Sequence, residues 1–486
     1  MRRSEPARVR AHPVLIVETI YRQLYLLLIP LVRGLLSIYS AASFYAWLQG
    51  AWVDILVLLF ILTASILNWL CQSYTADESG MTVRKGVIVR RMTTIPAASL
   101  STLMCYEPFY LRPLKAVRVY ADTDAGTFRR ADCQITIGRR DAEALLGSQH
   151  PQRPDASVKA YRPKWYDIAF LSVFVSSTFT GVVFLVTFFS KAGELFGNDF
   201  RDKLISQLEG VASLIAFIPT AAAVLALLIF FAWLIGFIHS FMSYIRFSVR
   251  REGNMLRVRY GWLSKRRYSC RTGAVNFIDY RQSMLSKLLR LSMVFIHCAG
   301  YAKSKDEHAV LIPASDDREV RRTIRRLLPE FQRSPRQLRP PRGSVVRYAM
   351  LPFWCSVLIP AATAVAARIF TFWASLIVFV GAMITVPFVW LLLVKIVDCH
   401  TAGLAVSHRH VTLYYTLGYA FHTVVVPREK INYIQLRSSV FQRWSGNCDV
   451  ILYTYSETVK RHQIGNLRLS EVTELLEKTG LMSETV

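Results

Sequence analysis

The sequence predicts a membrane protein of mixed α and β structure, with six transmembrane helices in three pairs and a small β-rich module after each pair. Two observations predict the helices: long apolar stretches with few charges come in pairs, and 53% of the 486 residues are hydrophobic. A soluble protein this apolar would need one very large core, whereas a membrane protein needs only apolar spans and polar connections. The third observation is that the chain changes character in the same way after each pair, which predicts a repeated module.

Each helix pair is long enough to cross a bilayer twice, since one crossing takes roughly 20 apolar helical residues. The first pair covers 24–74, with Gln49-Gly50 as a tight turn between its helices. The second pair covers 167–245 with a short external loop over 191–210, and the third covers 345–397. The alternative, buried helices of a soluble core, does not account for apolar stretches of this length.

The charges of the connections predict the orientation of the helices. The N-terminal segment and the segments that follow the first two pairs are rich in Lys and Arg, whereas the loop over 191–210 is slightly acidic. Because Lys and Arg collect on the cytoplasmic side, we expect both termini and all three modules in the cytoplasm. The chain carries 59 Lys and Arg against 33 Asp and Glu, a net charge of +26, which indicates an anionic partner.

Each module is expected to begin with strands and to end with a helix. An alternating strand opens each copy, at 81–85, 256–260 and 406–410, and a turn containing Gly86, Gly261 or Gly418 leads into the next strand. Several strands followed by one helix predict a small barrel or sandwich capped by that helix. The closing helices are expected at 141–146, 316–328 and 470–478, the last with Ser470 as its N-cap, and the modules at 75–150, 246–332 and 398–480. The other segments are a cytoplasmic N-terminal segment 1–23, a linker 151–166, a Pro- and Arg-rich linker 333–344 and a tail 481–486.

Four stretches carry a resemblance to a known family: His12-Pro13, Arg84-Lys85-Gly86, Thr93-Thr94-Ile95-Pro96 and residues 111–119. On these the chain resembles bacterial membrane proteins of the YdbT and YdbS type, which have bacterial pleckstrin-homology-like (PH-like) domains. The resemblance covers essentially the whole chain, because the unit of helix pair plus module occurs three times. It implies PH-like modules, a place in the bacterial cytoplasmic membrane, a smaller single-domain PH-like membrane protein as partner, and a role in envelope maintenance or tolerance of membrane-active peptides.

No motif of a known catalytic or metal site stands out in the sequence. There is no glycine-rich phosphate loop, no GxSxG or HExxH motif and no paired-carboxylate arrangement. The eight cysteines include no CxxC pair. His408 and His410 alternate as a metal pair on a strand would, but no third ligand is evident. We therefore expect no enzyme activity, no cofactor and no metal.

Basic residues on the strands of the first two modules are the candidate lipid-binding residues. Anionic lipids of the cytoplasmic leaflet attract basic clusters next to a membrane span, at about 1 kcal/mol per Lys or Arg. Aromatic residues of the modules sit at alternating strand positions, which is typical of a core rather than of a base-stacking platform, so we expect no nucleic acid partner. The candidates are Arg84, Lys85, Arg90 and Arg91 in the first copy, and Arg257, Arg259, Lys265, Arg266 and Arg267 in the second.

The leading hypothesis is a non-enzymatic membrane scaffold whose three cytoplasmic modules bind anionic lipid head groups, a partner membrane protein or both. The main alternative is a transporter or lipid-moving protein. That function needs a polar pathway between the spans, for which the sequence offers Arg33 and a few hydroxyl groups. A lipid-modifying enzyme and a homo-oligomer are further open alternatives.

Overall fold

The computed structural model describes residues 9–23, 44–77, 79–123, 131–149, 159–175, 220–298, 309–454 and 460–481. The chain forms two compact units. The first unit comprises Met1–Ala160, Val249–Val275 and Cys298–Glu307, and the second comprises Tyr161–Ser248, Asn276–His297 and His308–Val486.

A one-turn 3-10 helix divides every copy of the repeat into two halves. The three 3-10 helices are η2 (Ala97–Ser99), η3 (Thr272–Ala274) and η7 (Arg428–Lys430). The strands before this helix are called the front half of a copy, and the strands and closing helix after it are called the back half. The front halves contain β2 (Ser73–Asp77), β3 (Gly80–Lys85) and β4 (Arg91–Pro96); β9 (Ser248–Glu252), β10 (Met255–Tyr260) and β11 (Lys265–Arg271); and β15 (Gly403–Val406), β16 (His410–Leu417) and β17 (Ala420–Pro427). The back halves contain β5 (Leu100–Glu107), β6 (Ala116–Thr123), β7 (Cys133–Gly138) and α4 (Arg139–Gln149); β12 (Val275–Ser283), β13 (Leu291–Cys298), β14 (Val310–Asp316) and α11 (Asp317–Leu327); and β18 (Ile431–Arg437), β19 (Asn447–Thr454), β20 (Lys460–Arg468) and α15 (Leu469–Lys478).

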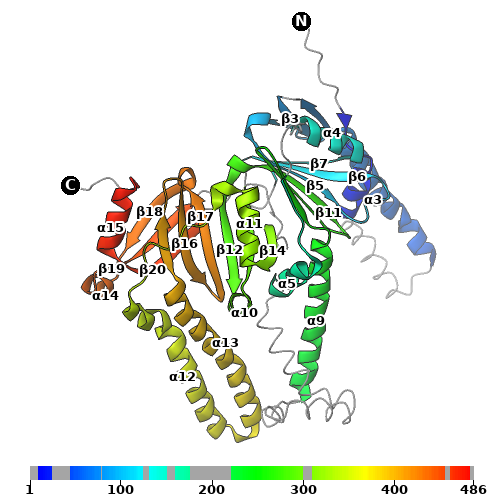
Figure 1. Cartoon of the computed structure of the whole chain (residues 1–486). Coiled ribbons are helices and arrows are strands. Elements are labelled where there is room, and N and C mark those ends of the chain that lie inside the picture. Colours follow the sequence, from blue (N-terminus) through cyan, green and yellow to red (C-terminus); the bar gives the residue numbers. More distant parts are fainter. Residues whose placement is uncertain are drawn as a thin grey trace. The chain divides into compact units, whose positions relative to one another are not determined.

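In the first unit, a sheet joins two successive copies. Its order is β7-β6-β5-β11-β10-β9-β8, where β8 is Lys159–Tyr161. The back half of copy one thus continues into the front half of copy two through the antiparallel pair β5–β11, which Figure 1 shows side by side. The front half of copy one, with β1 (Val9–Arg10), forms a separate four-stranded sheet in the order β1-β2-β3-β4.

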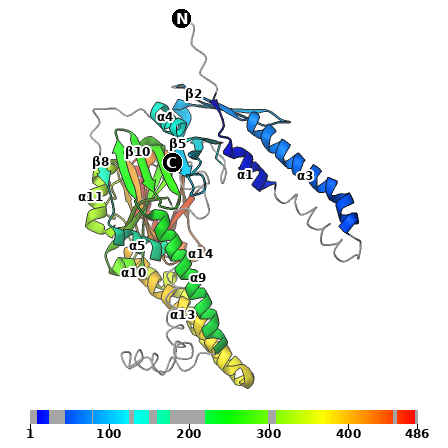
Figure 2. The same ribbon diagram turned by 90° about the vertical axis from the view of Figure 1, so that its right-hand side faces the viewer.

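The core of the first unit lies between these two sheets and α4. Met81 and Val83 of β3 contribute to it from the four-stranded sheet, and Leu103, Val119 and Ile135 from the larger one. In β3 the buried side chains alternate with more accessible ones, as a half-buried strand requires, whereas β5 is buried along most of its length. Before the strands, α1 (Val14–Arg22) and α3 (Phe44–Leu70) lie side by side (Figure 2), and Asn68 Nδ2 donates a hydrogen bond of 3.1 Å to Thr19 Oγ1.

The second unit repeats the same joining of copies. Its larger sheet has the order β14-β13-β12-β17-β16-β15, so the back half of copy two continues into the front half of copy three through β12–β17. The back half of copy three forms a three-stranded sheet, β18-β19-β20. Leu413, Val424, Val450 and Leu467 pack into one core with Val472 of α15.

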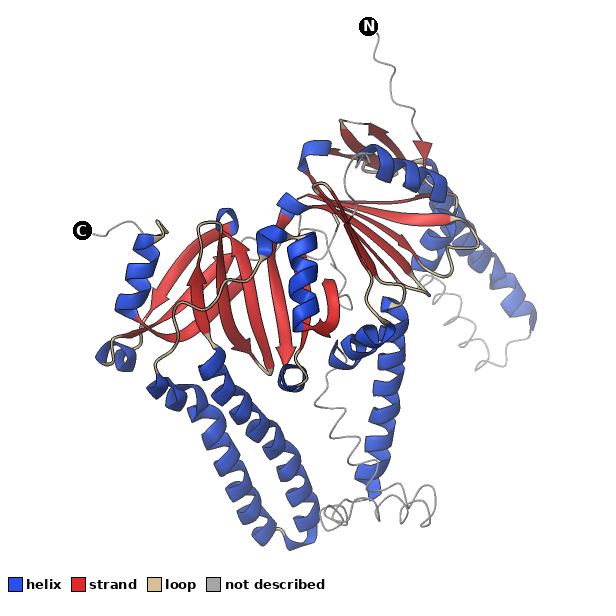
Figure 3. Ribbon diagram, in the orientation of Figure 1, coloured by secondary structure: helices blue, strands red, loops and turns tan. Residues whose placement is uncertain are grey.

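Two described helices of the second unit are long and apolar enough to cross a membrane. They are Arg342–Ile369 and Thr371–Thr401, which contain α12 (Val345–Ile369) and α13 (Ala374–Thr401) and pack against each other as antiparallel neighbours (Figure 3). The described residues thus contain two candidate spans, not the six predicted; 24–43 and 176–219, which include the external loop and Arg33, lie outside them. The other apolar helices are α3, of which Ile55–Leu70 is a shorter apolar stretch, α5 (Trp165–Val175) and α9 (Thr220–Tyr244).

Three local predictions are wrong. Helix α3 runs through Gln49 and Gly50 without the expected turn, because one glycine costs a helix only about 1 kcal/mol. In copy three the expected strand over 406–410 is a turn, in which the Ser407 amide donates to the His410 carbonyl at 2.9 Å, and the next strand begins at His410. The closing helix α15 begins at Leu469, whose amide donates to the Gly446 carbonyl, so Ser470 is not its N-cap.

Candidate functional site

The tips of the front-half hairpins expose apolar side chains in all three copies. Tip one (86–90) exposes Val87, Ile88 and Val89, and Ile88 is 96% exposed. Tip two (261–264) exposes Trp262 and Leu263, and tip three (417–419) exposes Leu417 and Tyr419. Hairpin turns are ordinarily polar, so apolar side chains at three equivalent tips indicate a surface that something apolar covers.

Backbone geometry makes tips one and two alike and sets tip three apart. Gly86 and Gly261 have φ of +105° and +100°, and a Cβ atom at either position would come within 2.0 Å of a carbonyl oxygen across the turn. Gly418 has φ of +60° with open space around it, in a two-residue turn between the paired residues Leu417 and Ala420. Only glycine fits the first two turns.

The connections after the first back-half strand expose a second set of apolar side chains. In copies two and three they are short helices, α10 (Met284–Leu288) and α14 (Val440–Trp444), each begun by a serine capping box. Trp444 of α14 is 82% exposed. Since these helices bury little, their caps rather than packing hold them in place. The exposed residues are Phe109, Tyr110 and Leu114 in the turn 108–115, Leu285, Leu288 and Leu289 at α10, and Val440, Phe441 and Trp444 at α14.

Strand pairing between copies brings the two sets together. Glu107 pairs with Lys265 across β5–β11, which places the turn 108–115 beside tip two, and Arg112 donates a hydrogen bond to the Trp262 carbonyl. These two segments form composite edge one. Ser283 pairs with Ala420 across β12–β17, which places α10 beside tip three as composite edge two.

Basic side chains border both composite edges. Exposed Lys115 and Arg259 flank composite edge one, and exposed Arg290 flanks composite edge two. Lys287 Nζ of α10 lies 3.9 Å from the ring centroid of Phe421. Burial lowers the pKa of Lys287 to about 8, although the charge of Asp398 opposes this shift.

In the second unit, tip three and the start of α14 lie against the apolar helices α13 and α12. The Tyr419 hydroxyl of tip three donates a hydrogen bond of 3.4 Å to the Pro387 carbonyl within α13. Arg347 of α12 donates to Ser439 Oγ, at the start of α14, at 3.2 Å. The start of α14 therefore lies near the first turn of α12, and tip three reaches the middle of α13.

The four candidate residues of copy one surround tip one. The pairing of Ser73 with Arg84 places this tip at the end of β2 that follows α3. Arg84, Arg90 and Arg91 are exposed, and Lys85 Nζ donates to the Gln134 carbonyl at 2.9 Å. Three exposed cations thus flank the most exposed apolar side chain of the tips.

The five candidate residues of copy two are divided by the alternation of their strands. Arg259 and Arg267 are directly opposite each other across β10–β11, whereas Arg266 lies with its guanidinium 5.1 Å from the Tyr106 ring centroid. Burial and then the charge of Arg267 lower the pKa of Arg259. Arg257 pairs with Glu252 at 2.9 Å. Lys265 and Arg259 are the members placed at composite edge one.

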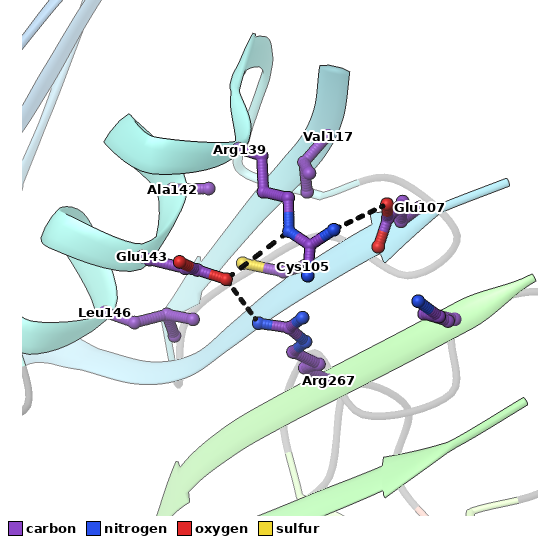
Figure 4. A pocket seen from close by; sticks show the side chains of 9 residues that line it. Cys105, Glu107, Val117, Arg139, Ala142, Glu143, Leu146 and Arg267 are labelled. Carbon is purple, nitrogen blue, oxygen red and sulfur yellow. Dashed lines mark hydrogen bonds and ion pairs between the residues drawn. The ribbon is translucent and has the colours of Figure 1, made fainter. Parts of the chain in front are cut away.

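Arg267 belongs to a compact ion-pair network on α4 and β5 (Figure 4). Glu143 accepts a hydrogen bond of 3.2 Å from Arg267 and forms an ion pair with Arg139 at 3.5 Å, and Arg139 also lies 3.8 Å from Glu107. The hydrogen bond from Arg267 lowers the pKa of Glu143. The cavity that they line has a volume of about 10 Å³, the size of one water, and burial raises the pKa of the adjacent Cys105 thiol to about 12. This network is structural and takes Arg267 away from lipid.

A larger cavity of about 370 Å³ lies where α12 and α13 meet β16 and β20. Lys395 and Arg461 line it together with Asp398, which Lys395 Nζ approaches to 3.4 Å. Its volume lies within the ~300–1,000 Å³ typical of sites for small molecules. Two cations against one carboxylate suit a phosphate-bearing group.

A buried charged cluster crosses the join of β12 and β17. His422 Nδ1 lies 3.0 Å from Asp279, and Arg281 Nε donates to the same carboxylate at 2.6 Å. Burial would raise the pKa of Asp279, but the charge and hydrogen bond of His422 hold it well below its usual range. His410, which alternates with His408 in the sequence, contacts Ser334 Oγ at 3.0 Å. Within the described residues, no three His, Cys, Asp or Glu side chains form a group that could hold a metal.

Sequence reasoning missed the apolar residues of the tips and turns. The signal that could have found them is apolar letters directly after a turn glycine, as in Gly86-Val87-Ile88-Val89 and Gly261-Trp262-Leu263.

A family model described as Bacterial PH domain matches the chain three times, at residues 25–152, 205–328 and 356–480. Each match covers one copy of the repeat together with apolar sequence that precedes it. No curated protein and no solved structure matches the chain.

Proposed function

The chain belongs to the bacterial PH domain family, and from this premise we propose that it is a non-enzymatic membrane scaffold that binds the anionic leaflet through its hairpin tips and composite edges. In this proposal six helices span the bacterial cytoplasmic membrane in three pairs, with both termini and all three PH-like domains in the cytoplasm. The partners are anionic lipids and a smaller single-domain PH-like membrane protein, and the role is envelope maintenance or tolerance of membrane-active peptides.

The observation that carries the proposal is the coincidence of apolar tips and cations at repeated positions beside apolar helices. Tip three contacts α13, and the start of α14 contacts α12. Equivalent surfaces in the other copies are therefore suited to lie beside their own apolar helices, within reach of the lipid interface. An apolar tip enters the interface while the flanking cations meet head groups. The cavity beside Lys395 and Arg461 adds a place for one phosphate head group.

The test uses the full-length protein in nanodiscs, with an environment-sensitive fluorophore on a cysteine at Ile88. We expect its emission to shift to the blue when phosphatidylglycerol is added to phosphatidylcholine, because tip one then enters the interface. A matched label at Glu474, on the exposed face of α15, is the control and should not respond.

A water-like emission from Ile88 on both lipids would overturn the proposed lipid contact. Cysteine accessibility to an impermeant reagent from the two sides of native vesicles tests the topology separately. Labelling of the position-474 cysteine from the periplasmic side would overturn the cytoplasmic placement of the domains.

A further inference from the structure

The two joins between copies follow one rule. In each, the first strand of a back half pairs with the last strand of the next front half, β5 with β11 and β12 with β17. The register is also the same. In the first join, Thr102 pairs with Cys270; Thr102 lies two residues after the start of β5, and Cys270 lies two residues before η3. In the second join, Ile278 pairs with Val425; Ile278 lies three residues after the start of β12, and Val425 lies three residues before η7.

Among the described strands, the rule leaves one strand edge open at each end of the repeat. Of the strands that the structure describes, only one lies beside β4, the last strand of the first front half, and only one beside β18, the first strand of the last back half. Both are largely exposed, with Met92 60% and Tyr433 52% accessible, whereas the strands of the internal joins are mostly buried. An open strand edge with apolar side chains is a template for another strand.

We propose that β18 of one chain pairs with β4 of a second copy of this chain, in the register of the internal joins. Counting from the start of β18 and of η2, the rule pairs Ile434 with Thr94, Gln435 with Thr93 and Leu436 with Met92. The second copy is the occupant because it carries the complementary half of an interface that the chain already makes twice. This inference stands independently of lipid binding.

The side-chain pattern of the proposed join matches the internal ones. In β5–β11, Leu103 of the first core lies opposite Ser269, and Thr102 lies opposite buried Cys270, so the cores of the two copies occupy opposite faces of the sheet. The proposed register places Ile434, which packs on the core of the second unit, opposite Thr94. It places exposed Tyr433 opposite Ile95, a core residue of copy one.

The same pairing would form a third composite edge. Tip one and α14 are each half of a composite edge, and the join would place them beside each other as tip two is placed beside 108–115. Such an interface joins unlike surfaces, so it builds a ring or a row of molecules within the membrane. One pair opposes it: Arg437 faces Arg91, and like charges across a strand pair repel.

The test mixes two differently tagged full-length populations in one membrane, one with Gln435→Cys and the other with Thr93→Cys, under mild oxidation. We expect a disulfide-linked dimer that carries both tags. The matched control is Gln435→Cys with Thr94→Cys, which is slipped by one residue onto the opposite face and should cross-link about tenfold less. Equal yields from the matched and slipped pairs would mean random collision and overturn the proposal.

Two further variants test the proposed pairing of β18 with β4. A chain that carries both Thr93→Cys and Gln435→Cys should give linked oligomers, and a disulfide closed within a single chain would overturn the second copy as the occupant. Arg437→Gln should raise the yield of linked dimer up to about fivefold, because it removes the repulsive pair. A lower yield would contradict the register.

Discussion

Tips one and two differ from tip three in three respects. Tips one and two have tight turns that require glycine, and they have neighbouring cations. Tip three has a two-residue turn with space around its glycine, has no Lys or Arg over 416–420, and lies against α13 through Tyr419. If the tips contact the membrane as proposed, a tip held against its own helix pair needs no charge to reach it, whereas the other two tips do.

Glycine replacement should produce the largest difference between the tips. Gly261→Ala places a Cβ atom 1.9 Å from the Ser264 carbonyl oxygen at a φ of +100°, so we expect a loss of about 2–3 kcal/mol. Gly418→Ala, at a φ of +60° in open space, should cost about 1 kcal/mol. Thermal unfolding in detergent measures both, with Gly273→Ala as a control whose backbone and surroundings accept a methyl group. Equal losses of folding stability in Gly261→Ala and Gly418→Ala would mean that both turns tolerate a side chain equally.

An acidic residue at the apolar tip should weaken insertion next most strongly. Ile88→Asp removes an exposed apolar side chain from the lipid contact, at a cost of about 2 kcal/mol. A fluorophore on Val89→Cys should then report a water-like environment on anionic nanodiscs. Leu417→Asp in tip three should leave a label on Ala420→Cys less affected, since Tyr419 still holds that tip to α13. Equal changes in the emission of the two labels would mean that the contact of Tyr419 with α13 does not account for the difference between the tips.

Charge removal should have a smaller effect that depends on salt. Arg90→Gln and Arg91→Gln should each cost about 1 kcal/mol of attraction to anionic lipid, and added salt should reduce the difference from the unmodified chain. Arg267→Gln is the matched control, because Glu143 already engages this guanidinium. The emission of the Ile88 label against the fraction of anionic lipid gives the comparison. A response of Arg267→Gln as large as that of Arg90→Gln would show that the network does not shield it.

The pH dependence of composite edge two should be the smallest effect. The pKa of Lys287 is about 8 in the folded chain and has the usual value of about 10.4 in the unfolded one, so between these values the unfolded state holds more protons. Stability should therefore rise as pH increases from 8 to 10, by about 1 kcal/mol once solvent screening is allowed for. Lys287→Gln should remove this part of the rise. Thermal midpoints at the two pH values measure it, and an unchanged slope in the variant would contradict the assignment.

Much of the local structure could be predicted from the sequence. The alternation of Met81 and Val83, and of Leu256 and Val258, correctly predicted β3 and β10, because burial on one face imposes a period of two. The closing helices α4, α11 and α15 lie within a few residues of their predicted positions. In copy three the pattern failed, because Val406 and His410 flank a turn and the buried pair is Val411 and Leu413.

The joins and the composite edges could not be predicted. The pairing of β5 with β11 connects strands on either side of the second apolar region, and no local pattern specifies such a partner. The surroundings of the candidate residues could not be predicted for the same reason. In the sequence Arg267 is one of a row of basic residues, and its ion pair with Glu143 depends on how α4 and β5 are placed in the fold.

The pairing of β5 with β11 also ties sheet completion to the order of synthesis. When the ribosome has made β5, its partner does not yet exist, and the chain between them includes the apolar stretch that precedes β9. The edge of β5 must therefore stay open until β11 has been made. If the second helix pair enters the membrane as proposed, a defect in its insertion would leave the first domain with an uncovered β-edge, which chaperones and proteases could bind. On the proposed topology, folding of the domains and insertion of the helices would be one process.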